Sequence, residues 1–308
     1  MSSSAHQPPQ IARANGIDIC YEIFGDAAAE PMLLIMGLGA QMILWDDEFC
    51  RELAARGFRV IRFDNRDIGK SGRLSGGTRL TPLELLKLRF LKIPVQAPYK
   101  LRDMAEDTTG LMDALGIKSA HLVGASMGGM IAQEIAISFP QRVRSLTSIM
   151  STTGNPKVPP PSREAAAMLM APPPTTKEEY LVRFAQTWKV LRVGSFPLDE
   201  ARDLERAERT FERGLNPNGV GRQLRAILAS GSRKERLHAV KAPTLVIHGT
   251  VDPLVRPEGG KDTAASIPGA KLLMIEGMGH ALPIPMWPEI IAAIDKHAHG
   301  EAARPLKP

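Results

Sequence analysis

The stretch HLVGASMGGMIAQEIA, residues 121–136, decides the fold. Residues 124–128 spell G-x-S-x-G, with an apolar run before Ser126 and a helical pattern after it. Such a sharp turn from strand to helix holds the central serine in a strained backbone conformation, and small flanking residues let strand and helix approach closely. Because the new helix also directs free N–H groups at this point, the stretch predicts a nucleophile beside an anion site.

Short apolar or β-branched runs alternate with helical patterns on both sides of this turn. The probable strands are 17–25, 32–36, 59–64, 120–124, 143–150, 244–249 and 270–277, with a weak early strand near residues 10–14. The probable helices are 47–57, 101–116, 127–140, 257–269 and 285–298. This alternation predicts an α/β fold with a mostly parallel, eight-stranded twisted sheet flanked by helices. The short connection between 17–25 and 32–36 lets these two runs pair as an antiparallel hairpin.

The alternation stops after the sixth strand. Residues 154–235 begin with a proline-rich stretch, continue with helical patterns and contain no evident strand candidate. We therefore expect a core domain of residues 11–152 and 236–300, with a helical cap (lid) of residues 153–235 inserted after strand 6. Such a cap lies over the carboxyl ends of the strands, where open α/β sheets bind ligands.

A second irregular segment spans residues 76–98. The helix candidate within it, 82–92, is apolar nearly all round. It fits either a helix packed under the insertion or a second lid element that lines the substrate path or touches a partner.

Length and composition set the class of protein. A chain of 308 residues, 44% of them hydrophobic, is long enough for one large α/β domain with an insertion. It contains no run of 18 uncharged apolar residues, so stable membrane insertion is not expected. The N-terminus lacks the layout of a secretory signal, and two lone cysteines, Cys20 and Cys50, suit a reducing compartment. We expect a cytoplasmic protein that is a monomer or a homodimer.

The formal net charge of +6 comes from basic residues spread along the chain, with many arginines within 183–236. No nucleic-acid-binding motif accompanies them, so a solvated basic face is the better interpretation and no nucleic-acid partner is expected.

A serine hydroxyl needs an adjacent base, and the base needs an acid that orients it. Asp252 directly follows the strand 244–249, and His280 directly follows the strand 270–277. Carboxyl ends of parallel strands share one sheet edge, so Ser126, Asp252 and His280 are expected to meet there, in the chain order of this fold's triads. The alternatives are that Asp252 caps a helix near Pro257 and that His280 is an ordinary loop histidine.

The remaining histidines are expected to be structural. His248 lies at the end of its strand, and Glu276 is a packing or hydrogen-bonding neighbour of His280. None of the histidines has metal-ligand spacing with another ligand type, so the sequence predicts neither a metal nor a cofactor.

Acyl transfer also needs donors for the developing oxyanion. The backbone N–H of Met127, directly after the serine, is one candidate, and the N–H of Leu38, in the loop after 32–36, is the other. The predicted substrate-binding residues are Gly37, Met42 and Trp45. Leu38, Met42, Met127, Met168 and Met170 suggest an apolar acyl pocket, although methionines at such places also serve as core residues.

Several stretches together resemble the α/β-hydrolase superfamily. They are MGLGAQMILWDDEF, VIRFDNRDIGKSGR, LRDMAEDTTGLMDALGI, HLVGASMGG, PTLVIHGTVDPLV and IEGMGHALP. Within this superfamily the chain looks most like the capped bacterial serine esterases, including aclacinomycin methylesterase-like proteins. These proteins share a Met-Gly pair after the third strand (Met36-Gly37 here), where a His-Gly pair is usual.

This resemblance implies Ser126, Asp252 and His280 as the triad, with Leu38 and Met127 forming the oxyanion hole. It also implies that residues 64–67 form a mainly structural turn.

The predicted activity is that of a carboxylic ester hydrolase that works through an acyl-enzyme intermediate on small-to-medium acyl or aryl esters. Ser126 argues against epoxide hydrolases and haloalkane dehalogenases, which use an aspartate nucleophile. Cofactor-free perhydrolases (haloperoxidases) and carbon–carbon bond hydrolases keep the serine triad and remain alternatives. A third alternative, from another class, is a hydrolase-fold receptor that only binds a hydrophobic ligand under its cap.

Overall fold

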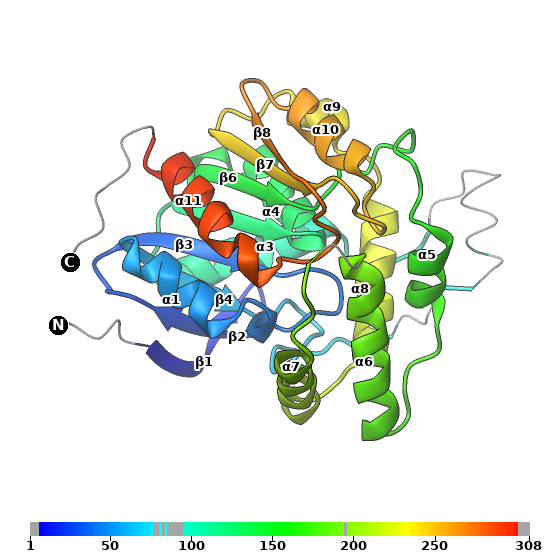
Figure 1. The fold of residues 1–308 in the computed structure, drawn as a ribbon. Coiled ribbons are helices and arrows are strands. Elements are labelled where there is room, and N and C mark those ends of the chain that lie inside the picture. Colours follow the sequence, from blue (N-terminus) through cyan, green and yellow to red (C-terminus); the bar gives the residue numbers. More distant parts are fainter. Residues whose placement is uncertain (1–5, 77–79, 82–83, 85–94, 194–195, 301–308) are drawn as a thin grey trace.

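The fold is built on one twisted sheet with helices on both faces (Figure 1). The computed structural model describes residues 6–76, 80–81, 84, 95–193 and 196–300. Within these residues the sheet has eight strands in the order β1-β2-β4-β3-β5-β6-β7-β8. The strands are β1 (His6–Ala14), β2 (Ile17–Phe24), β3 (Glu30–Ile35), β4 (Phe58–Phe63), β5 (Ala120–Ala125), β6 (Val143–Ile149), β7 (Thr244–Gly249) and β8 (Lys271–Ile275). From β4 to β8 all neighbours are parallel, so the predicted fold class is confirmed.

The predicted hairpin between 17–25 and 32–36 is wrong. Strand β2 pairs antiparallel with β1 and β4, whereas β3 lies between β4 and β5. Residues 32–35 of β3 are fully buried and alternate between the two core clusters, and such a strand belongs in the middle of a sheet. The hairpin partner of β2 is the edge strand β1, whose two prolines fall at the register shift between Gln7 and Gln10, a position that prolines tolerate.

Helices cover the two faces of the sheet and enclose two hydrophobic clusters. On one face lie α3 (Leu101–Ala114), α4 (Met127–Ser138) and the short α9 (Lys234–Leu237). On the other lie α1 (Asp47–Ala55) and α11 (Trp287–Ala298), and α10 (Pro257–Ser266) packs along β7 and β8. The ends of the helices α1, α3, α4, α10 and α11 fall within three residues of their predicted positions.

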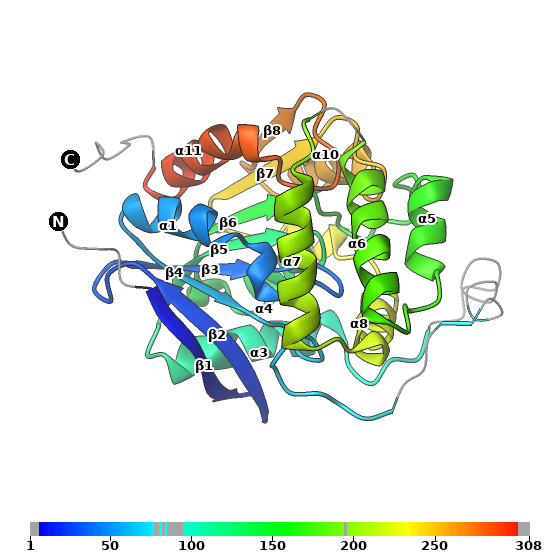
Figure 2. The same ribbon diagram turned by 60° about the horizontal axis from the view of Figure 1, so that its bottom comes forward.

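Between β6 and β7 the chain leaves the sheet and forms helices α5 (Arg163–Met170), α6 (Lys177–Arg192), α7 (Glu200–Arg213) and α8 (Pro217–Ser230). Figure 2 shows these helices side by side at the end of the sheet where the parallel strands finish. The helix candidate at 82–92 lies largely outside the described residues. Among the helices of the described residues, none has the length and hydrophobicity needed to cross a bilayer.

The two ends of this helical segment meet. The N–H of Arg233 donates to the carbonyl oxygen of Thr153 at 2.8 Å. The fully buried guanidinium of Arg233 donates to the Thr152 carbonyl and to the Gln133 side chain of α4. Entry and exit of the segment are therefore fastened to each other and to the core.

Candidate active site

Ser126 stands at the junction of β5 and α4 with the strained backbone that its motif predicts. Its φ and ψ angles are 55° and −119°, a region that a residue with a side chain adopts only when its surroundings enforce it. The surroundings are tight, because a Cβ on Gly124 would lie 2.3 Å from the Gly128 carbonyl oxygen. The backbone N–H of Ser126 donates to the Ile149 carbonyl at 2.9 Å, which ties the turn to β6.

The three side chains predicted to act together are within hydrogen-bonding distance of one another. Nε2 of His280 lies 3.0 Å from Oγ of Ser126, and Nδ1 of His280 lies 2.7 Å from Oδ2 of Asp252. Asp252 is fully buried and His280 is 6% exposed. This arrangement can draw a proton from the serine to Nε2 while the carboxylate keeps the other ring nitrogen protonated.

Asp252 is held as a carboxylate in a fixed orientation. Its Oδ1 accepts the backbone N–H groups of Leu254 and Val255, both at 2.9 Å, so its own loop takes up one oxygen and leaves the other for His280. Burial alone would raise the pKa of Asp252, but the nearby imidazoles of His280 and His248 outweigh it and keep the pKa well below its usual range. Asp252 does not cap α10, because the N–H groups that it accepts belong to residues before that helix.

His248 contacts the loop that carries Asp252. Its ring is fully buried, with Nε2 2.8 Å from the Val255 carbonyl oxygen and 3.5 Å from Oδ2 of Asp252. This agrees with the structural role expected for it.

The loop after β3 brings its backbone against the serine. A Cβ on Gly37 would lie 3.2 Å from the Ser126 Cβ, a tight contact that the glycine avoids. Within the described part of the chain, no acceptor contacts the backbone N–H of Leu38 or that of Met127. Among the described residues, neither donor is therefore committed to another acceptor.

Residues 64–67 hold the surrounding loops in place. Oδ1 of Asp64 accepts the N–H of Met42 at 2.7 Å, and the Asn65 amide donates to the Met36 carbonyl oxygen at 2.9 Å. Arg66 forms an ion pair with Asp107 of α3. The turn thus fixes both ends of the loop that carries Leu38, in agreement with its implied structural role.

A cavity of about 960 Å³ opens onto Ser126 and His280. Its walls are mostly apolar and come largely from the loop after β3 and from α5, α6 and α8. They include Gly37, Leu38, Trp45, Met168, Met170, Tyr180, Phe184, Trp188, Val220, Leu224 and Leu228. Of the predicted substrate-binding residues, Gly37 and Trp45 line this cavity. Met42 does not, because its side chain is fully buried with Cys20 and Ile43, and Met127 packs in the core between the sheet and α4.

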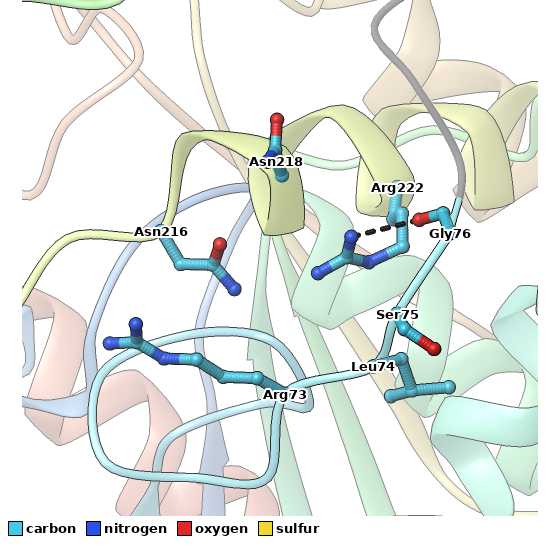
Figure 3. Close-up of a pocket in the computed structure, with 7 residues that line it drawn as sticks. All are labelled: Arg73, Leu74, Ser75, Gly76, Asn216, Asn218 and Arg222. Carbon is cyan, nitrogen blue, oxygen red and sulfur yellow. Dashed lines mark hydrogen bonds between the residues drawn. The ribbon is translucent and has the colours of Figure 1, made fainter.

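A second, smaller cavity of about 340 Å³ lies between residues 73–76 and the start of α8 (Figure 3). Its Arg222 is already engaged, since the guanidinium forms a bidentate ion pair with Asp67 and donates to the Gly76 carbonyl oxygen at 2.9 Å. None of the residues that line it belongs to the Ser126–His280–Asp252 chain, so the larger cavity is the candidate site.

Sequence reasoning missed the contributions of α6, α7 and α8. The aromatic wall of the cavity, Tyr180, Phe184 and Trp188, recurs every fourth residue along α6, and this spacing was a readable signal of a shared helix face. Gln223 of α8, which contacts the loop after β3, had no such signal, because a lone glutamine in a helical pattern is normally a surface residue.

Comparison with known proteins finds relatives of similar sequence, a solved structure of similar fold and a matching family model. The rhodomycin D methylesterases DauP of Streptomyces sp. (strain C5) and DnrP of Streptomyces peucetius are each 30% identical to it, over 94% of this chain and 98% of theirs. The crystal structure of an esterase, RhEst1, from Rhodococcus sp. ECU1013 superposes with a TM-score of 0.72 at 19% identity, covering 96% of this chain and 99% of that one, which is a likeness of fold. The family model described as alpha/beta hydrolase fold matches residues 30–285. The chain therefore belongs to the alpha/beta hydrolase fold family.

Proposed function

We propose that this protein is a serine hydrolase that cleaves carboxylic esters through an acyl-enzyme intermediate. The observation that carries the proposal is the continuous hydrogen-bond chain from Ser126 Oγ through His280 to the buried Asp252, at the wall of an apolar cavity. Similarity to two methylesterases over nearly the whole chain supports ester hydrolysis.

The geometry suggests the following course of reaction. Ser126 attacks the ester carbonyl while Nε2 of His280 takes its proton, and the developing oxyanion accepts the N–H groups of Leu38 and Met127. His280 then protonates the departing alcohol. Water, activated by the same ring, hydrolyses the acyl-enzyme and restores the serine. Asp252 keeps Nδ1 of His280 protonated throughout, so every proton transfer occurs at Nε2.

For the substrate we propose an ester of an aryl or medium-sized acyl acid with a small alcohol such as methanol. A cavity of about 960 Å³ lined by aromatic and aliphatic side chains is large enough to hold a bulky acyl group. The two relatives are methylesterases by name, which favours a methyl ester. We further propose that residues 153–235 act as the cap, that the enzyme is cytoplasmic, and that it works as a monomer or homodimer. Its two cysteines are free and buried, as a reducing compartment allows.

The test is an ester panel on wild type, on Ser126→Ala and on Ser266→Ala, a buried serine of α10 that serves as the matched control. The panel contains p-nitrophenyl esters of graded acyl length and methyl esters of aryl acids. Removing the nucleophile should lower kcat by about 10⁴–10⁶, on the order of 5–8 kcal/mol, and the control should keep wild-type rates.

Rates that are equal in wild type and Ser126→Ala would overturn the proposal. Three further assays cover the alternatives: a vinylogous diketone for carbon–carbon cleavage, peroxide with acetate for perhydrolysis, and ligand binding without turnover for a receptor. Faster turnover in one of the first two assays, or binding without any turnover, would replace ester hydrolysis by that function.

A further inference from the structure

The loop that carries Leu38 contains a turn whose shape depends on one peptide group. The carbonyl oxygen of Gly37 accepts the N–H of Ala40 at 3.3 Å, and Gly39 has a φ of +69°. A positive φ at the third position of a four-residue turn is the mark of a type II turn. Rotation of its central peptide, which joins Leu38 to Gly39, converts a type II turn into type I. A contact from outside the turn can therefore stabilise one orientation of that peptide over the other.

Gln223 supplies this contact from α8. Its Oε1 accepts the N–H of Gly39 at 2.9 Å, and its Nε2 donates to the carbonyl oxygen of Arg66 at 2.9 Å. The side chain is fully buried. Because one end must accept and the other must donate, the amide can sit in only one orientation between these two backbone groups.

The contact distinguishes two neighbouring N–H groups. The N–H of Gly39 is committed to Gln223, whereas that of Leu38 has no acceptor among the described residues. If the central peptide rotated, the N–H of Gly39 would leave Gln223 and the carbonyl oxygen of Leu38 would turn toward Oε1, oxygen against oxygen. Gln223 thus fixes the 38–39 peptide and ties the turn that carries the Leu38 N–H to the Arg66 carbonyl oxygen, so that the position of this turn depends on α8.

The other anchors of this loop act farther along it. Asp64 binds the N–H of Met42, and the Gln41 amide donates to the carbonyl oxygens of Thr210 and Gly214 at the end of α7. These contacts fix where the loop leaves the site. They do not fix the 38–39 peptide, which Gln223 contacts directly.

We propose that Gln223 is a positioning residue for the oxyanion hole, supplied by the helical segment inserted after β6. The inference rests on the proposed serine-dependent ester hydrolysis and adds to it the requirement that α8 be docked for the hole to form. Gln223 lies outside the set of residues that line the large cavity, so its effect acts through Gly39 and Leu38 rather than through contact with substrate.

The experiment compares Gln223→Met with Gln133→Met. Gln133 is the matched control, since it is also fully buried, accepts from Arg233 and lies outside the cavity. Three quantities are measured: kcat and KM on a p-nitrophenyl ester, Tm, and the affinity for a trifluoromethyl ketone, whose adduct with the serine places an anionic oxygen in the hole.

Gln223→Met should lower kcat by about 10–100-fold with KM changed less than about threefold, and the affinity for the ketone should fall in proportion to kcat. Gln133→Met should lower Tm and leave kcat unchanged. Gln223→Glu provides a second test, because its carboxyl group can both accept from Gly39 and donate to Arg66 only when protonated. Its kcat relative to wild type should therefore rise as the pH falls.

The outcomes separate the two proposals. If wild type hydrolyses esters through Ser126 but both Gln223 variants keep kcat within about twofold at every pH, the positioning role is wrong and the proposed function stands. The same holds if kcat of the Gln223 variants falls only in step with Tm, as a general loss of stability would produce. If wild type shows no hydrolysis that depends on Ser126, the proposed function itself fails.

Discussion

Gly128 packs directly against the carbonyl oxygen of Ile35, so closely that a Cβ on Gly128 would lie 2.0 Å from that oxygen. Ile35 ends β3, and Gly128 lies in the first turn of α4. The contact therefore sets the distance between the loop that follows β3 and the helix that follows Ser126.

Gly128→Ala is expected to push α4 away from β3. The neighbouring atoms are backbone and cannot move aside singly, so the free energy of unfolding should fall by about 1–3 kcal/mol. The kcat for ester hydrolysis should fall by at least about tenfold, because the serine and the N–H of Leu38 separate. Denaturant titration and steady-state kinetics measure the two effects. Gly110→Ala in α3, where a Cβ would lie 3.0 Å from the Asn15 nitrogen and 3.3 Å from the Ala14 Cβ, is the control and should leave kcat unchanged.

Asp252→Asn is expected to keep the fold and lose activity. The asparagine oxygen can still accept from Leu254 and Val255, which turns the amide NH₂ toward Nδ1 of His280. The ring must then carry its proton on Nε2 and cannot accept the proton of Ser126, so kcat should fall by about 10⁴. Asp262→Asn, which loses an ion pair with Lys234 and makes no contact with Ser126, His280 or Asp252, should retain activity. Near-wild-type kcat in Asp252→Asn would contradict the role given to the carboxylate.

The same variant should alter how stability depends on pH. The pKa of Asp252 is lower in the folded than in the unfolded chain, so its stabilisation is complete above the unfolded pKa, near 4, and is lost as the pH falls through the folded pKa. Between about pH 4 and pH 2 the unfolding free energy of wild type should therefore fall more steeply than that of Asp252→Asn. Urea titrations at several pH values measure both slopes; equal slopes would mean that the pKa of Asp252 is not lowered by folding.

Arg213→Met is expected to destabilise the protein much more than Arg209→Met on the same helix. Arg213 donates to the fully buried Asp64 at 2.5 Å, whereas Arg209 pairs with Asp47 at 3.6 Å on a more exposed surface. Loss of the buried partner should cost about 3–5 kcal/mol, and loss of the exposed one less than about 1 kcal/mol.

The Arg213 effect should also depend on pH. Burial already raises the pKa of Asp64, and removing the arginine that opposes this shift raises it further. A raised pKa in the folded chain means that stability falls as the pH rises from the unfolded pKa, so Arg213→Met should recover part of its stability under mildly acidic conditions. Equal losses for the two arginine variants at every pH would show that the pair with Asp64 contributes little.

Leu224→Trp is expected to narrow the substrate range. Leu224 lines the large cavity from α8, so an indole there takes up space that a bulky acyl group would fill. The kcat/KM for a naphthoate ester should fall by at least about tenfold, while that for p-nitrophenyl acetate changes by less than about threefold. Leu204→Trp, at a 49% exposed position on α7, should affect neither substrate. Equal losses on both esters would mean that the acyl group does not occupy this space.

The residues of the hydrogen-bond chain were predictable from the sequence because each follows a strand directly. In a parallel sheet, chain position then dictates spatial position, and Ser126, Asp252 and His280 reach one edge whatever the loops between them contain. The strain at Ser126 was likewise readable, since only Gly124 and Gly128 allow the close approach that produces it.

What the sequence did not reveal depends on contacts between distant segments. A short connection suggested that β2 and β3 pair with each other, but the burial of both faces of β3 places β4 between them. Met42 fits a pocket lining by residue type and loop position, yet its backbone is drawn to Asp64 and its side chain into the core. Gln223 and Gly39 are 184 residues apart, and no local pattern links them.

The joined ends at Thr153 and Arg233 bring the two chain connections of helices α5–α8 to one place on the core. Recombination could therefore replace residues 153–235 by a different segment without changing the strand order of the sheet. The new segment would have to supply a side-chain acceptor for the N–H of Gly39 as well as a new cavity wall. Substrate range and catalytic rate would therefore change together in evolution.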